Sequence, residues 1–465
     1  MIARIRSAIR RVRGSELGGF AGDTFFVGTW QGAISVADLI QIALITHALG
    51  LHAYGRLAIV LSFVVLIGQF FDVRVGVAAT TFGSRKLVAG DLRGAAGVFQ
   101  LSYLVDGVTG VAGFVVVAGL APFVGPHLVG NGGTWLIFLY ALTLLASTVD
   151  ESSISILRLL DRFRLIAVYT IALEVLRVTA LVVALSLWKS LTAVLLVLLA
   201  YDVVAGAVNL AAAAVAYRRV AHRPLRQPSL EAVGAIERRS FIRTVLQTNV
   251  VSYARLSQQQ LPTLLIGVLS GANQVGLYKV GTAAAAMIGR AADPAYAALL
   301  PRLSRMWSAG KRADVRRLLA RATLIAAPAI TIVLVVLVVL RHPVLELIGG
   351  SAARDASVTV LVLAAIGQAV NAALFWNVGL LFAAGRAGIV AVVAVVATLI
   401  QIALLIPLTV FFDANGAAGA LLASYVVTNI AVTAAALRVL GWPGGRQSQA
   451  GQLADSPIPA PHRQP

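Results

Sequence analysis

Apolar segments of about 20 residues recur from one end of this chain to the other. Each segment is long enough to cross a hydrocarbon core about 30 Å thick as an α-helix. The apolar runs are continuous and do not alternate every second residue, which favours helices over a transmembrane barrel. Of the 465 residues, 59% are hydrophobic and only 12% are charged, whereas soluble domains carry about 25% charged residues. We therefore predict an all-α membrane protein.

The hydropathy pattern predicts about twelve transmembrane helices. The expected spans are 25–47, 57–82, 99–122, 134–157, 165–187, 190–216, 244–269, 276–300, 321–341, 358–383, 389–412 and 417–440. The first span is longer than the apolar core of a signal peptide and no convincing cleavage site follows it, so we expect a retained helix.

The spans divide into two groups of six. Residues 25–216 are expected to form an N-lobe and residues 244–440 a C-lobe, joined by a cytoplasmic connector at 217–243. Residues 1–24 form a basic cytoplasmic segment. The proline-rich residues 441–465 are expected to form a disordered cytoplasmic tail.

Lysine and arginine concentrate in every second loop. With the N-terminus inside, the outer segments hold only Arg56, Lys189, Arg341 and Arg354, with Lys279 just inside the eighth span. The positive-inside rule then places both termini in the cytoplasm of a bacterial inner membrane. The net charge of +19 follows from this topology, and we expect no nucleic-acid partner.

No motif indicates catalysis. The chain has no cysteine, and its 6 histidines are not spaced for a metal. No phosphate-binding loop or nucleophile elbow occurs. The longest outer loop, about 342–357, is too short to hold the catalytic domain of a sugar polymerase. We predict that the protein is not an enzyme and needs no cofactor or metal.

The two halves align when the sequence is shifted by 221 residues. The aligned pairs are Gly50 with Gly271, Gly55 with Gly276, Gly68 with Gly289, and Asp72 with Asp293. A slip of one residue aligns Ala89-Gly90 with Ala309-Gly310. Six-helix halves of the same orientation imply a pseudo-twofold axis along the membrane normal and a central site between the lobes, as in transporters.

Polar residues share one face on three of the predicted spans. A charge at the bilayer centre costs about 2.5–3.5 kcal/mol and normally faces protein or water. We therefore expect helices 1, 2, 7 and 8 to line an aqueous cavity, with Asp38 opposite Gln259. The faces consist of Gln31, Ser35, Asp38 and Gln41; of Thr248, Ser252, Arg255 and Gln259; and of Lys279, Thr282, Arg290 and Asp293.

The signs of these charges differ between the halves. Arginine binds phosphate oxygens strongly, so the basic second half suits a phosphate-bearing headgroup. Carboxylates in the membrane suit the coupling of H⁺ or Na⁺. The predicted substrate-binding residues are Arg255, Arg290, Lys279, Arg74, Gln259 and Gln31, and the predicted ion-coupling residues are Asp38, Asp72 and Asp293.

Some charges allow a purely structural interpretation. Glu174 and Arg177 are one helical turn apart in the fifth span and could pair, with Asp202 joining them. Asp106 has no evident partner in the sequence.

Short motifs in both halves resemble the polysaccharide flippases, the O-antigen and exopolysaccharide exporters of the multidrug/oligosaccharidyl-lipid/polysaccharide (MOP) superfamily. In the first half they are Leu49-Gly50, Tyr54-Gly55, Asp72-Val73 and Gly76-Val77-Ala78-Ala79. In the second half they are Gly271, Val275-Gly276-Leu277-Tyr278 and Leu300-Pro301-Arg302-Leu303-Ser304. The resemblance covers roughly residues 20–440. Arg74 stands where the family pattern usually has glycine.

This resemblance implies a V-shaped, twelve-helix carrier with a fold like that of the MATE transporters. It would move undecaprenyl-diphosphate-linked oligosaccharide from the cytoplasmic to the periplasmic leaflet by alternating access. Membrane lipids and polysaccharide polymerase or export proteins are the implied partners. Two alternatives stay open: a cation-coupled multidrug antiporter of the same fold, and a non-transporting membrane scaffold.

Overall fold

The structure is a computed structural model that describes residues 16–71, 75–221, 231, 233–234, 239–242 and 250–441. Within these ranges, the side chains of 16–27, 250–257, 291, 293–295, 297, 298 and 301 lie outside the description. The predicted tail and most of the predicted connector and N-terminal segment also fall outside it. The described residues form helices joined by short turns, with no strand among them.

The first lobe runs from α2 to α9. Its elements are α2 (Glu16–Leu49), α3 (Leu51–Phe71), α4 (Val75–Val88), α5 (Leu92–Leu128), α6 (Gly133–Ala146), η1 (Ser147–Val149), α7 (Asp150–Leu159), α8 (Phe163–Trp188) and α9 (Leu191–Ala221). The second lobe runs from α11 to α17. Its elements are α11 (Val250–Leu269), α12 (Ala272–Ser308), α13 (Arg312–Val339), α14 (Arg341–Gly349), α15 (Val358–Ala373), α16 (Trp376–Ala383) and α17 (Ala387–Val439).

These helices confirm the predicted all-α membrane fold. Nine helices of the described chain are long and apolar enough to cross a membrane. The last of them, α17, is two helices that meet at Asp413, where φ is 50°, between the predicted spans 389–412 and 417–440. The more polar α11 and α12 are also long enough to span.

Several helices extend beyond the predicted apolar spans. Helix α5 starts at Leu92 because Asp91 caps it, with its carboxylate accepting a hydrogen bond of 2.7 Å from the backbone N–H of Gly94. Helices α12 and α13 meet in a short turn after Ser308, so most of the residues between the predicted spans 276–300 and 321–341 belong to the ends of these two helices. Polar residues outside the hydrocarbon continue a helix as readily as apolar residues inside it.

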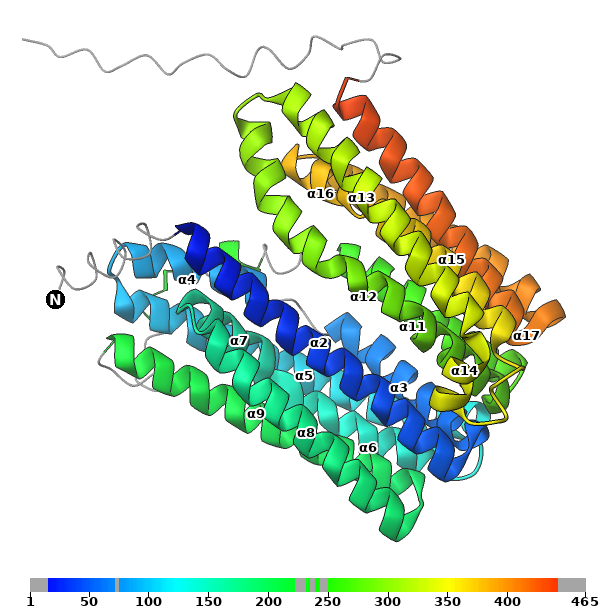
Figure 1. The fold of residues 1–465 in the computed structure, drawn as a ribbon. Helices are drawn as coiled ribbons and strands as arrows, with labels where there is room; N and C mark the ends of the chain where they lie inside the picture. The colour runs from blue at the N-terminus through cyan, green and yellow to red at the C-terminus, as the bar shows by residue number, and fades with distance from the viewer. Residues whose placement is uncertain are drawn as a thin grey trace, which may run out of the picture.

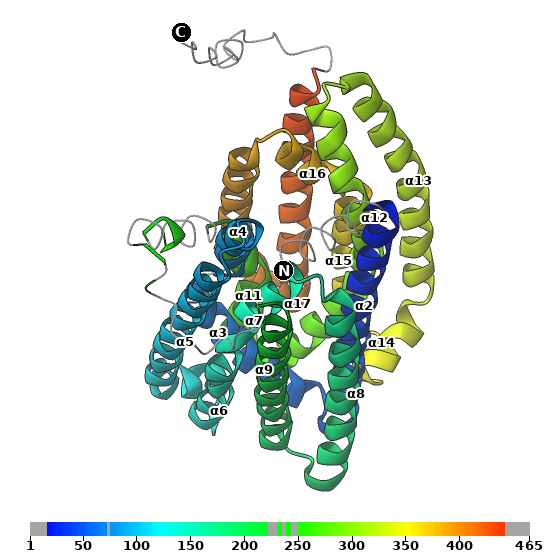
Figure 2. The same cartoon turned by 90° about the vertical axis from the view of Figure 1, so that its left-hand side faces the viewer.

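The two lobes form a V (Figure 1). They lie together at one end, which we call the closed end and which holds the α2–α3 turn, the α11–α12 turn and α14. They separate toward the opposite, open end, where α4 meets α5 and α12 meets α13 (Figures 1 and 2).

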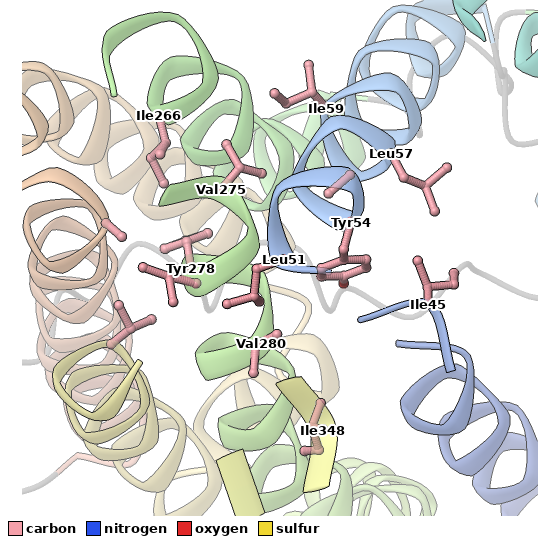
Figure 3. Close-up of a cluster of buried hydrophobic side chains, with 14 of the residues drawn as sticks. Ile45, Leu51, Tyr54, Leu57, Ile59, Ile266, Val275, Tyr278, Val280 and Ile348 are labelled. Atoms are coloured by element: carbon pink, nitrogen blue, oxygen red, sulfur yellow. The ribbon is translucent and has the colours of Figure 1, made fainter. Parts of the chain in front are cut away.

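The buried apolar clusters follow this shape. The largest cluster contains residues of both lobes, among them Ile45, Tyr54, Ile266 and Val280 (Figure 3). Toward the open end each lobe has a cluster of its own, around Phe99 in the first lobe and around Leu303 in the second. Among the described side chains, apolar burial therefore joins the lobes at the closed end.

Two glycines allow the lobes to touch through their backbones at the closed end. A side chain at Gly55 in α3 would overlap the carbonyl oxygen of Ala272, and one at Gly276 in α12 would overlap that of Leu51. Gly55 and Gly276 are 221 residues apart, and so are Leu51 and Ala272. The contact is therefore reciprocal: a glycine of each lobe packs against a backbone carbonyl of the other lobe, at equivalent positions of the repeat.

The turns of the two lobes also correspond. Five pairs of residues with positive φ lie at offsets between 220 and 224. They are Gly50 with Gly271, Gly90 with Gly310, Gly130 with Gly350, Asp161 with Gly385, and Lys189 with Asp413. The hydrogen bond from the N–H of Asp91 to the Lys86 carbonyl has its counterpart in that from Lys311 to Met306.

We expect Gly276→Val to push the lobes apart at the closed end, because the new side chain would occupy the position of the Leu51 carbonyl. The cysteine-free chain allows spin labels to be placed at Lys189→Cys and Leu347→Cys, which are exposed at this end on opposite lobes. Double electron–electron resonance should show longer label distances in the variant. The matched control is Gly119→Val, since nothing lies within 4 Å of a side chain there. Equal distances in both variants would contradict this role of Gly276.

Candidate functional site between the lobes

Asp38 on α2 receives positive charge from both lobes. Its carboxylate lies 2.9 Å from the guanidinium of Arg177 on α8, within the first lobe. On its other side, the guanidinium of Arg290 on α12 approaches to 3.8 Å from the second lobe. The side chain of Asp38 is 40% exposed, so it lies at the boundary between the protein interior and the space between the lobes.

Arg177 is the buried partner in this arrangement. Its side chain is 11% exposed, and it also contacts Glu174 at 2.7 Å. The guanidinium lies over the ring of Tyr201 on α9 at 5.1 Å, and the Tyr201 hydroxyl donates to Glu174 over 2.7 Å. The predicted Glu174–Arg177 pairing is confirmed, and the pair extends to Asp38. A buried arginine in the membrane needs its charge paired in this way, and Arg177 keeps one donor, Nε, buried without a hydrogen-bond partner among the described residues.

Arg290 is the exposed partner. It donates a hydrogen bond of 3.1 Å to the backbone carbonyl of Ser35 on α2, and its side chain is 41% exposed. An ion pair at 3.8 Å between half-exposed groups contributes little, about 0–1 kcal/mol. Arg290 can therefore leave Asp38 for another anion at low cost, while Asp38 keeps Arg177.

Acidic residues extend further into the first lobe. Asp150 in α7 accepts a hydrogen bond of 2.8 Å from the amide of Asn209 in α9. The amide oxygen of Asn209 is buried without a hydrogen-bond partner. Asp106 in α5 accepts a hydrogen bond from Ser152, which corrects the expectation that it has no partner. The first lobe thus has acids and acceptors that a proton or small cation could use.

The structure places the other predicted site residues as follows. Lys279 on α12 is half-buried, and among the described residues its ammonium has no hydrogen-bond or ion-pair partner. Gln31 and Gln259 are exposed. Arg290 is a second-lobe side chain that reaches Asp38, and the expected opposition of Asp38 and Gln259 stays a prediction.

Four predicted residues lie wholly or partly outside the description. Asp72 and Arg74 fall in the gap between α3 and α4. Arg255 and Asp293 lie on the described backbones of α11 and α12, but their side chains lie outside the description.

Comparison with known proteins agrees with this architecture. Residues 20–307, well over half of the chain, match the sequence profile of a family described as polysaccharide biosynthesis protein. The inner membrane protein YghQ of Escherichia coli strain K12 is 25% identical over 306 residues, covering 62% of this chain and 83% of that protein.

Solved structures share the fold. An inward-facing multidrug resistance MATE family transporter of the MOP superfamily superposes with a TM-score of 0.66 at 12% identity, covering 88% of this chain and 96% of that one. A MOP superfamily transporter from Pyrococcus furiosus Vc1 (DSM3638), for which a binding pocket of reverse polarity is described, superposes with a TM-score of 0.61 at 14% identity. The superposition covers 91% of this chain and 94% of that one.

The two arginines should differ in their effect on stability. Arg177→Gln leaves Asp38 and the buried Glu174 without their cation, and removal of one partner of a buried ion pair costs about 3–5 kcal/mol. Arg290→Gln removes only a half-exposed contact and should cost at most about 1 kcal/mol. Thermal unfolding in detergent should therefore show a much lower Tm for Arg177→Gln than for Arg290→Gln. The reverse order would contradict the assignment of Arg177 as the structural cation.

Proposed function

Because this chain belongs to the polysaccharide biosynthesis protein family and has the fold of MOP superfamily transporters, we propose that it is a flippase for undecaprenyl-diphosphate-linked oligosaccharide. It would carry this substrate from the cytoplasmic to the periplasmic leaflet of the inner membrane by alternating access, for surface polysaccharide biosynthesis. The glycan and diphosphate would enter the space between the lobes while the polyprenyl chain stays in the lipid.

The observation that carries the proposal is the position of Arg290. Its guanidinium is half-exposed between the lobes and is held by one distant carboxylate and one backbone carbonyl. A guanidinium binds a phosphate through two parallel hydrogen bonds, which are stronger than either present contact. Arg290 would turn from Asp38 to the diphosphate, and Lys279 and Arg255 on the same lobe would add positive charge.

The basic turns support the proposed direction of transport. The turns at the open end carry Arg85, Lys86, Arg158 and Arg386, and the positive-inside rule assigns such turns to the cytoplasm. In this orientation the V opens to the leaflet in which lipid-linked glycans would be assembled. The reciprocal glycine contact would then close the periplasmic side.

Coupling to H⁺ or Na⁺ belongs to the first lobe in this proposal. Three acids of this lobe, Asp38, Asp150 and Asp202, outnumber Arg177, the arginine of the same lobe that contacts Asp38 in the described part of the chain. Entry of a cation would reduce the repulsion among these acids. Asp72 and Asp293, at matching positions in the two lobes, are further candidates.

A multidrug antiporter is the second candidate function, favoured by the same acidic lobe. A cationic drug would be attracted to Asp38 but repelled by Arg290 beside it. The two functions are therefore separable at a single residue.

We expect Arg290→Gln to abolish most glycan transport without loss of folded protein, because it removes the phosphate-binding cation but only a weak contact. A deletion strain complemented with the variant should accumulate lipid-linked glycan in the inner leaflet, measured by extraction and by leaflet-selective labelling. The matched control is Arg321→Gln, which replaces an exposed arginine on α13. This variant should restore transport.

Two other results would decide against the flippase. Full transport by the Arg290→Gln variant would show that Arg290 does not bind the diphosphate, which contradicts the proposal. Changed resistance to cationic dyes in the deletion strain, with unchanged surface glycan, would favour the antiporter.

The orientation can be tested separately, since the chain has no cysteine. Ala352→Cys, exposed after α14, should react with a membrane-impermeant maleimide in intact spheroplasts. Ala309→Cys, exposed in the turn between α12 and α13, should react only after permeabilisation. The opposite labelling pattern would reverse the direction of opening.

A further inference from the structure

The first lobe contains a hollow separate from the contact of Asp38 with the two arginines. It has a volume of about 200 Å³ and is bounded by α3, α5 and the α6–η1–α7 segment. Complete small-molecule sites commonly have about 300–1,000 Å³, so this hollow suits one part of a larger ligand. Its polar and aromatic lining includes Gln69, Phe71, Asp106, Ser147, Thr148 and Glu151.

One residue of the lining, Gln69, faces the second lobe. Gln69 lies 14 residues after Gly55 on α3, so the two residues point within about 40° of each other on the helix. Gly55 faces the second lobe at the closed end. Gln69 therefore faces the same way nearly four turns further along α3, away from the closed end. Ser147 and Glu151 at the edge of the hollow are exposed.

The lining suits a polyhydroxylated ligand. Carboxylates accept strong hydrogen bonds from hydroxyl groups, and an amide and hydroxyls can both donate and accept. Phe71 adds an apolar ring against which the C–H face of a sugar can pack. This combination recognises a neutral sugar better than it recognises a phosphate, which the two carboxylates would repel.

The size of the hollow argues against a bare cation. A cation is held by several oxygens that converge on it at 2.0–2.6 Å, and even a water molecule takes only about 30 Å³. The hollow is several times larger than either. The size and the polar lining of the hollow suit a ligand part that carries several hydroxyl groups better than a bare cation.

We propose that this hollow is the subsite for the sugar residues next to the diphosphate, which rests on the flippase function proposed above. Arg290 on the second lobe would hold the diphosphate, and Gln69 and Glu151 on the first lobe would hold the sugars. The substrate would then connect the two lobes and take the place of the contact between Arg290 and Asp38. Selection among glycans belongs to the first lobe, and recognition of the common lipid diphosphate belongs to the second.

The test uses two probes: the lipid-linked oligosaccharide that accumulates in a strain lacking this protein, and undecaprenyl diphosphate without sugar. Dissociation constants are measured on the purified full-length chain in detergent. Glu151→Gln keeps the shape of an exposed side chain but loses the charged acceptor, so it should bind the glycosylated lipid about tenfold more weakly. Gln69→Ala should do the same. Binding of undecaprenyl diphosphate should stay within about twofold for both variants.

Two control variants separate the possible failures. Asp314→Asn removes an exposed carboxylate outside the hollow and should leave both constants unchanged. Arg290→Gln should weaken both probes equally. Equal weakening of both probes by Glu151→Gln and Gln69→Ala, or no weakening, would overturn the subsite and leave the flippase standing. If the strain accumulates no lipid-linked glycan, or the wild-type chain binds neither probe, the flippase and the subsite both fail.

Discussion

The architecture depends on the backbone contact between α3 and α12 at the closed end. A carbonyl oxygen can approach a neighbouring helix this closely only where that helix has no Cβ, and Gly55 and Gly276 supply such positions. Without this approach, the apolar residues that surround the contact could not form one cluster across both lobes. Membrane helices commonly associate through small residues because the lipid provides no hydrophobic force between them. Here the same device joins two halves of one chain, and its reciprocity makes both halves contribute equally.

The polar contacts complement this apolar closure. Arg177 is held by a buried carboxylate and an aromatic ring, and it neutralises Asp38 from inside the first lobe. Arg290 shares Asp38 from across the gap through a longer contact. The difference in burial gives the two arginines different roles, since only the exposed one can change partners without leaving a buried charge unpaired. Asp38 keeps Arg177 as its partner when Arg290 turns to another anion. This arrangement suits a site that must be stable both without and with its substrate.

Much of the fold could be predicted from the sequence, because each span needs a continuous apolar run that hydropathy detects directly. The repeat was visible where glycines occupy both copies, as at Gly50 and Gly271. It was invisible at Lys189 and Asp413, which share a positive φ but no residue type. Helix α14 was also missed: its nine residues lie in the predicted outer loop and are too few to give a clear apolar period.

The site was predictable only where it is charged. Asp38, Arg177 and Arg290 are conspicuous in apolar surroundings, whereas Tyr201 and Asn209 are neutral and act through contacts 27 and 59 residues away in the chain. Such pairings depend on how helices pack and leave no local pattern. The same holds for the opposition of Asp38 and Arg290, which are joined only because α2 and α12 lie side by side.

The separate apolar clusters of the two lobes have a consequence for how the sequence of such a protein can evolve. The cluster around Phe99 and the cluster around Leu303 share no residue, so repacking in one lobe leaves the packing of the other intact. The effects of substitutions on the free energy of unfolding are additive when the sites are distant and independent. Over evolutionary time, one lobe is therefore free to acquire residues that recognise a new substrate, while the other lobe preserves the residues that bind the part common to all substrates.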